Sequence, residues 1–103
     1  KVKGISHITG GGFFENIPRS VPDGLCAVIE KKNVRVLPVF DLIMKRGGID
    51  ERDMFNTFNM GVGMSVVVAK DDADKALEIL QAAGEKAYVL GEITRGDEKI
   101  RIV

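Results

Sequence analysis

The stretch Gly4–Arg19, "GISHITGGGFFENIPR", joins a strand-like run to three consecutive glycines. Apolar and polar residues alternate imperfectly over residues 3–9, which predicts a short strand. The glycines and Pro18 then predict a loop, with one helical turn over residues 12–16. The stretch therefore predicts a strand that ends at a tight turn, where backbone groups can approach a ligand closely.

The rest of the chain alternates strand and helix signals. Pro38 can begin a helix that Gly47 and Gly48 end, and Asp50 can cap a second, short helix. The β-branched run at 66–68 is typical of a strand covered on both faces. The other expected elements are a strand at 25–30, a helix capped by Asp71 or Asp72 and ended by Gly84, and strands at 87–93 and 99–103.

This order of elements predicts one α/β (α+β) domain in which helices pack on one face of a mixed sheet. Its last strand–helix–strand unit resembles half of a ferredoxin-like fold. The final two strands are expected to form a hairpin around the turn "RGDE" at residues 95–98.

Composition excludes several classes of protein. The 103 residues carry 15 basic and 15 acidic side chains, so no net charge attracts nucleic acid or an anionic membrane. No apolar run reaches the ~18–20 residues that span a bilayer. The single cysteine, Cys26, cannot form an intrachain disulfide, and no set of residues has zinc spacing. These absences favour a cytoplasmic location for the protein.

The glycine turn and its neighbours are the first candidate site. Gly10, Gly11 and Gly12 can present backbone N–H groups to an anion such as phosphate. They match neither a Walker A loop nor a dinucleotide fingerprint. His7 lies at the end of a strand and can exchange protons near neutral pH. The alternatives are a tight structural turn and a histidine that makes one structural hydrogen bond.

Two further groups of polar and small residues are candidates. Asn16 and Arg19 follow the glycines and suit the recognition of phosphate or carboxylate, although a solvated loop would carry the same residue types. Asn59, Gly61 and Gly63 lie in "FNMGVGM", where the glycines require a close approach of a ligand, a bulge or a neighbouring backbone. No acidic cluster suggests a metal site, because the aspartates at 71, 72 and 74 suit helix caps.

Two motifs together resemble one family. "HITGGGFFENIPR" at 7–19 and "TFNMGVGM" at 57–64 are similar to the C-terminal part of aminoimidazole ribonucleotide synthetases, also called phosphoribosylformylglycinamidine cyclo-ligases. The start of the helix at 38–40, the Asp53-Met54 pair and "LGEI" at 90–93 follow in the family's order. The resemblance covers nearly the whole chain.

The resemblance implies an activity and roles for the candidate residues. The family uses ATP, with Mg²⁺, to close the imidazole ring of formylglycinamidine ribonucleotide, giving aminoimidazole ribonucleotide, ADP and phosphate. It implies that His7 contacts the reacting group. The implied substrate-binding residues are Thr9, Gly10, Gly11, Gly12, Asn16 and Arg19, and the implied cleft-shaping residues are Asn59, Gly61 and Gly63.

The resemblance also implies that two domains of a longer protein bind different components of the reaction. Residues 1–103 would be one partial C-terminal domain, without the N-terminal domain that binds ATP and metal and without its own opening strand and helix. The start at Lys1, inside a strand-like pattern, agrees with this expectation. We therefore expect a homodimeric full enzyme and an inactive fragment that self-associates. The alternatives are a non-catalytic, ferredoxin-like ligand-binding module and another ATP-dependent synthetase of the same superfamily.

Overall fold

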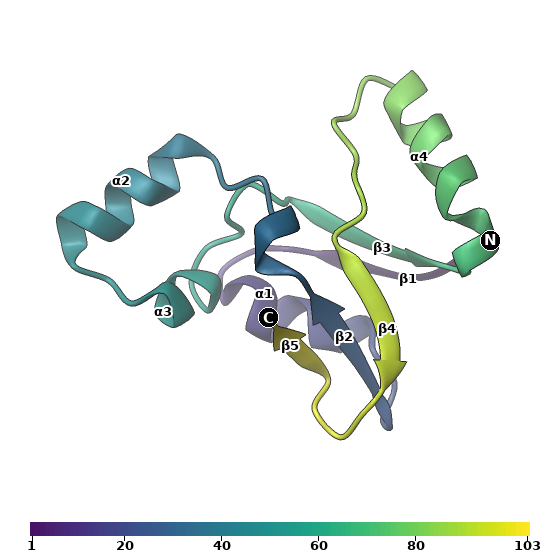
Figure 1. The fold of residues 1–103 in the computed structure, drawn as a ribbon, viewed down its shortest axis with the longest axis horizontal. Helices are drawn as coiled ribbons and strands as arrows, with labels where there is room; N and C mark the ends of the chain where they lie inside the picture. Colours follow the sequence, from purple (N-terminus) through teal and green to yellow (C-terminus); the bar gives the residue numbers. More distant parts are fainter.

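A computed structural model describes all 103 residues, Lys1–Val103. It contains both α-helices and β-strands, which confirms the predicted α+β fold class. Figure 1 shows the arrangement of the elements. The strands are β1 Val2–His7, β2 Leu25–Ile29, β3 Met64–Val68, β4 Gly91–Arg95 and β5 Ile100–Ile102. The α-helices are α1 Gly12–Asn16, α2 Pro38–Gly47, α3 Glu51–Phe55 and α4 Ala73–Ala82. Short 3-10 helices are η1 Ile17–Ser20, η2 Lys31–Asn33 and η3 Lys70–Asp72.

The predicted helix boundaries agree with the structure. Pro38 is the first residue of α2, where its missing N–H costs nothing. Gly48 ends that helix in the left-handed region, with φ 58°, and its N–H donates to the carbonyl of Met44. Asp50 and Asp72 occupy the N-cap positions of α3 and α4, but neither side chain makes the capping hydrogen bond that was expected.

The strands form two sheets, whereas one mixed sheet was expected. β1 pairs with β3 in an antiparallel sheet of two strands. β2 lies at the centre of a mixed sheet, antiparallel to β4 and parallel to β5. β3 and β4 therefore belong to different sheets, and the last strand–helix–strand unit does not share one sheet as a ferredoxin-like half does.

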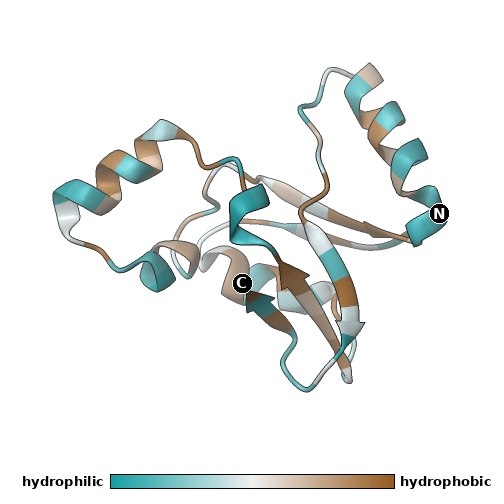
Figure 2. Cartoon of the chain, in the orientation of Figure 1, coloured by the Kyte–Doolittle hydropathy of each residue, from teal (hydrophilic) through white to brown (hydrophobic).

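The two longer helices do not cover a sheet face. Neither α2 nor α4 has a buried residue, although both carry hydrophobic as well as hydrophilic positions (Figure 2). Both extend away from the strands in Figure 1. Ile79 of α4 is 58% exposed. The expected packing of helices on one face is thus met only by the short α1, η1 and α3.

The predicted hairpin between the last two strands is wrong. β4 and β5 lie on opposite sides of β2, because the apolar segment of β2 pairs along both of its edges. The connection between them crosses the end of β2: Gly96 N–H donates to the Gly24 carbonyl at 3.1 Å, and Ala27 N–H donates to the Lys99 carbonyl at 2.9 Å.

The strand expected at 87–93 begins only at Gly91 and continues to Arg95. Residues 87–90 are held by other contacts. The Tyr88 hydroxyl accepts a hydrogen bond from the Arg35 N–H at 3.0 Å, and the Arg35 guanidinium lies 4.3 Å from the centre of the Tyr88 ring. Gln81 Nε2 donates to the Ala87 carbonyl at 3.1 Å. These contacts attach Ala87 and Tyr88 to segments other than a neighbouring strand.

An exposed ion pair joins the segments that precede β2 and β5. Lys99 Nζ lies 2.9 Å from Asp23 Oδ1. The hydrogen bond from Lys99, together with its charge, holds the pKa of Asp23 below its usual value. Because the Asp23 side chain is 96% exposed, solvent screens the pair and it adds little to stability.

The core lies where β1, β2, α1, η1 and α3 meet. Phe13 is fully buried and packs edge-to-face on Phe55, with ring centres 5.1 Å apart. Burying one such side chain stabilises the fold by about 1.5–3 kcal/mol. The buried cluster is Ile8, Phe13, Ile17, Val21, Ala27, Ile29, Val34, Met54, Phe55 and Met60. β3 contributes none of these residues, so the expectation that it is covered on both faces is wrong.

Gly12 permits α1 to pack directly on the backbone of α3 and the segment after it. Its φ is 62°, in the region that L side chains rarely adopt. A Cβ atom at this position would overlap the carbonyl oxygen of Phe55 and lie 2.7 Å from that of Phe58. Gly12 is therefore required by close packing of two backbone segments.

We expect Gly12→Ala to lower the free energy of unfolding by about 3 kcal/mol or more, since left-handed strain and a backbone clash act together. Gly10→Ala is the matched control, because no atom lies within 4 Å of the position of its Cβ. Urea denaturation of both variants measures the difference. Equal stability of the two variants would contradict the packing described for Gly12.

Candidate functional site

A hollow of about 380 Å³ brings the two sequence motifs together. The first motif contributes Thr9 and Gly10, and the second contributes Thr57, Phe58 and Asn59. The antiparallel pairing of β1 with β3 places the end of one motif beside the end of the other, and the Ile8 N–H donates to the Gly63 carbonyl at 2.9 Å. Ile8, also from the first motif, and Phe40 of α2 complete the lining.

The buried side chain of Asn16 holds the glycine turn in place through hydrogen bonds. The side chain is only 2% exposed. Its Nδ2 donates to the carbonyls of Thr9, Gly10 and Gly12 at 3.1, 3.3 and 2.9 Å. Its Oδ1 accepts from the Thr9 hydroxyl at 3.3 Å. The carboxamide is thus occupied by the turn itself, so within this chain Asn16 shapes the site through the backbone that it binds.

The turn leaves two backbone donors free. Gly12 N–H donates to the Thr9 carbonyl at 3.0 Å, whereas the N–H groups of Gly10 and Gly11 donate to no group of the chain. Gly10 is exposed and lines the hollow. Gly11 has φ 98°, and a Cβ there would lie 2.7 Å from the Glu15 Cβ. Unpaired N–H groups in such a turn suit an anionic ligand.

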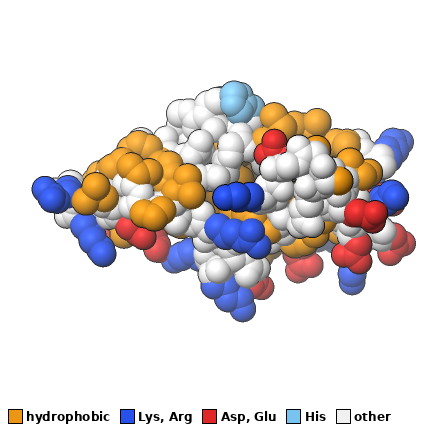
Figure 3. Space-filling view, turned by 90° about the horizontal axis from the view of Figure 1, so that it is seen from above, with side chains coloured by type: hydrophobic (Ala, Val, Ile, Leu, Met, Phe, Trp, Pro, Cys, Tyr) orange, Lys and Arg blue, Asp and Glu red, His pale blue; other side chains and the backbone are white.

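His7 and Arg19 lie on the surface near this region of the chain but outside the lining of the hollow. His7 is the last residue of β1, is exposed and pairs with Met64 of β3. Figure 3 shows the single histidine at the surface, beside hydrophobic side chains. Its imidazole and the Arg19 guanidinium form no ion pair within the chain. Both side chains are free to contact a ligand.

The second motif folds back on itself. Asn59 Oδ1 accepts the Gly61 N–H at 2.9 Å, which closes a local turn. Gly61 has φ 101°, and a Cβ there would lie 2.9 Å from the Leu37 side chain, so close packing accounts for this glycine. Gly63 is exposed with open space where a Cβ would be. Of these three residues, only Asn59 lines the hollow.

Sequence reasoning missed four residues of the lining, and one of them, Ile8, stands between His7 and Thr9 in the first motif. Thr57 and Phe58 stand inside the second motif, so their position there was the available signal. Phe40 was expected as part of a helix start, and its ring lies 5.7 Å from that of Phe58. Its contribution to the hollow follows from the packing of α2 on α3, which no local pattern indicates.

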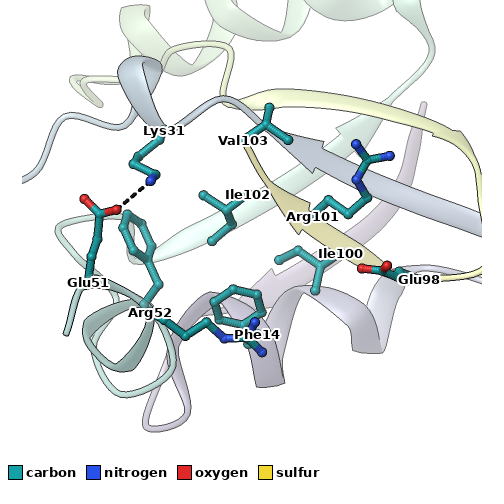
Figure 4. Close-up of a pocket in the computed structure, with 10 residues that line it drawn as sticks. Phe14, Lys31, Glu51, Arg52, Glu98, Ile100, Arg101, Ile102 and Val103 are labelled. Carbon is teal, nitrogen blue, oxygen red and sulfur yellow. Dashed lines mark hydrogen bonds and ion pairs between the residues drawn. The ribbon is translucent and has the colours of Figure 1, made fainter.

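A second hollow of about 260 Å³ contains none of the predicted site residues. Figure 4 shows its floor, where Ile100 and Ile102 point from β5 toward Phe14. The Arg52 guanidinium lies 3.9 Å from the centre of the Phe14 ring. Lys31 and Glu51 form an ion pair at the rim. Of the two motifs, only the first reaches this hollow, through Phe14.

No group of three or more His, Cys, Asp or Glu side chains comes together in a way that would hold a metal ion. The lining of the first hollow has no charged side chain. None of the helices is long and apolar enough to cross a membrane. The arrangement offers hydroxyl, amide and backbone N–H groups to a ligand, with His7 and Arg19 on nearby segments.

We expect Asn16→Asp to lower stability by about 1–3 kcal/mol at neutral pH, because the carboxylate loses the three donated hydrogen bonds and faces carbonyl oxygens. Burial and these oxygens raise the pKa of the introduced carboxyl group above its unfolded value. The folded state of the variant then binds more protons, so its deficit relative to the parent shrinks as pH falls. Denaturation at several pH values measures this deficit, and a deficit independent of pH would contradict the described environment. Asn16→Ala is the control, since it cannot titrate.

Comparison with known proteins places the chain in a family. Residues 1–103 match the family model described as AIR synthase related protein, C-terminal domain. A phosphoribosylformylglycinamidine cyclo-ligase of Caldicellulosiruptor saccharolyticus is 56% identical over 97 residues, which are 94% of this chain and 28% of that protein. Enzymes of the same name from Lachnoclostridium phytofermentans and Bifidobacterium longum subsp. infantis are 50% and 52% identical, over 97% and 99% of the chain and 29% and 30% of their own lengths.

The chain thus spans less than a third of each of these curated relatives. The family match, in contrast, covers it from the first residue to the last. Both motifs that meet at the first hollow lie inside the matched range. The chain belongs to the family of AIR synthase related proteins and corresponds to the C-terminal domain of that family.

Proposed function

We propose that this chain is the substrate-side, C-terminal domain of a phosphoribosylformylglycinamidine cyclo-ligase. The observation that carries the proposal is the hollow at which "HITGGG" and "TFNMG" meet, since these are the two motifs of the resemblance. The relatives that bear this name support it with about half of their aligned residues identical. The enzyme would close the imidazole ring of formylglycinamidine ribonucleotide, giving aminoimidazole ribonucleotide, ADP and phosphate.

In the proposed reaction, the main task of this chain would be to bind and orient the substrate, and not to supply a general acid and a general base. ATP would phosphorylate the formyl oxygen, and the amidine nitrogen would then attack the activated carbon and expel phosphate. Positioning of the nucleophile beside that carbon lowers the barrier because it removes the entropic cost of their encounter. The free N–H groups of Gly10 and Gly11 would bind the substrate phosphate. Thr9, Arg19 and Asn59 would orient the rest of the substrate.

His7 would contact the reacting group. Its imidazole is exposed at the end of β1 and has no partner within the chain that would hold it away from a ligand. Asn16 would act as a positioning residue, because its carboxamide fixes the carbonyls on both sides of the free N–H groups. Gly12, Gly61 and Gly63 would shape the cleft by leaving room for neighbouring backbone and ligand.

The residues at the first hollow do not fit Mg²⁺. Magnesium in such sites is bound by carboxylates together with substrate phosphates, and the first hollow has no carboxylate in its lining. We infer that ATP and Mg²⁺ bind to an N-terminal domain elsewhere in a longer polypeptide, in a cytoplasmic homodimeric enzyme. Residues 1–103 would form one partial C-terminal domain of that polypeptide.

We expect His7→Ala to lower the turnover of a full-length enzyme that contains these residues by about 10²-fold or more, the usual size of a lost proton-transfer or charge contact. Its stability should change little, because the side chain is exposed. Lys3→Ala is the matched control, since Lys3 is exposed on the same strand outside the motifs. Product formation is measured with saturating ATP and Mg²⁺. Turnover equal to that of the control would remove His7 from the mechanism.

The isolated 103-residue chain should form no aminoimidazole ribonucleotide from the substrate with ATP and Mg²⁺, because it offers no carboxylate set for the metal. Addition of a full-length relative in trace amount shows that the assay works. Binding of the substrate to the isolated chain, measured by calorimetry, should persist. Turnover by the chain alone would contradict the assignment of ATP and Mg²⁺ to another domain. A chain that does not bind this substrate would favour the non-catalytic module that binds a different ligand.

A further inference from the structure

We propose that the Asp23–Gly24 peptide unit isomerises spontaneously to isoaspartate, and that the ion pair between Asp23 and Lys99 slows this reaction. The modification site lies in the turn before β2 and lines neither hollow, so the inference does not depend on the proposed function. It rests on the exposure of the turn, on the free backbone nitrogen of Gly24 and on the contact of the carboxylate with Lys99.

The reaction joins a backbone nitrogen to the side chain that precedes it. The Gly24 nitrogen attacks Cγ of Asp23, a C–N bond forms, and the proton of the nitrogen leaves with the carboxyl hydroxyl as water. The product is a cyclic succinimide. Water then adds to either ring carbonyl. Addition at the former main-chain carbonyl of Asp23 leaves Gly24 attached through Cγ, which is isoaspartate, with an extra methylene in the backbone and an unchanged mass.

The position of Asp23 leaves this attack unobstructed. Asp23 is the one aspartate of the chain that precedes a glycine, and its side chain is 96% exposed. Gly24 is exposed as well, and no atom lies within 4 Å of the position of a Cβ there. Because glycine has no side chain, nothing at residue 24 shields its own nitrogen from the neighbouring carboxyl group.

The nitrogen of Gly24 has no hydrogen bond to lose. Its N–H donates to no group of the chain. The Leu25 N–H donates to the Pro22 carbonyl at 3.2 Å, and Gly24 has φ 84°, so Asp23 and Gly24 are the two central residues of a β-turn. β2 begins only at Leu25, after this peptide unit. Ring closure therefore needs a change within one exposed turn and not in a strand.

Lys99 keeps the carboxyl group of Asp23 in its unreactive form. Its Nζ lies 2.9 Å from Oδ1, and this hydrogen bond, together with the positive charge, lowers the pKa of the Asp23 carboxyl. The hydroxyl leaves as water only from the protonated carboxyl group, so a lower pKa reduces the reactive fraction at neutral pH. An exposed pair that adds little to stability thus still protects the chain from a covalent change.

The test is a timed incubation of the 103-residue chain near neutral pH, followed by tryptic digestion. The peptide of residues 20–31 contains the site, and its aspartate and isoaspartate forms have equal mass but separate by chromatography. The parent should accumulate isoaspartate slowly, and Lys99→Ala should do so about threefold faster or more. Lys32→Ala is the matched control, since it removes an exposed lysine that pairs with Glu30, and it should behave like the parent. No isoaspartate at residue 23 in Lys99→Ala, or a rate equal to that of the parent, would overturn the proposal.

Salt tests the role of Lys99 without a mutation. High salt screens an exposed ion pair, so it should raise the rate of the parent toward that of Lys99→Ala. The rate of Lys99→Ala should change little, because it has no pair to screen. Asp23→Glu should form no isomer at this position, which identifies the reacting side chain. A salt effect as large in Lys99→Ala as in the parent would show that Lys99 does not control the reaction.

Discussion

The close contact of Gly12 with the carbonyl groups of Phe55 and Phe58 determines how the two halves of the chain meet. Because no side chain stands between them, α1 rests on the end of α3, and the rings of Phe13 and Phe55 pack edge-to-face beside the contact. The core cluster forms around this pair. A bulkier residue at position 12 would separate the two segments and, with them, the two motifs that line the first hollow.

The candidate site combines a turn whose carbonyl groups are held in place with backbone N–H groups that have no partner. The buried Asn16 fixes carbonyls of the glycine turn, while the N–H groups of Gly10 and Gly11 donate to no group of the chain. The carboxamide has used its donors on the turn and is not available to a ligand there. A backbone site of this kind needs no charged side chain of its own to receive an anion, since the oriented N–H groups supply the positive ends of their dipoles.

Sequence reasoning worked best where one residue acts on its own backbone. Pro38 and Gly48 mark the two ends of α2, because proline presets the helical φ angle and glycine permits the left-handed conformation that ends a helix. It failed for the last two strands. A turn-like "RGDE" sequence is compatible with a hairpin, but β2 pairs along both edges and lies between β4 and β5. Pairing between segments that are distant in sequence decided that outcome.

The sequence by itself determined the class of fold, most of the helix boundaries and the two motifs of the site, because these depend on local backbone preference and on residue type. Tertiary structure alone decided that the strands form two sheets, that Asn16 faces inward to the turn, and that Thr9, Gly10 and Asn59 share one hollow while His7 and Arg19 lie outside its lining. The physical reason is that burial and hydrogen-bond partners belong to pairs of segments. A pattern within one segment cannot specify which distant segment will cover it.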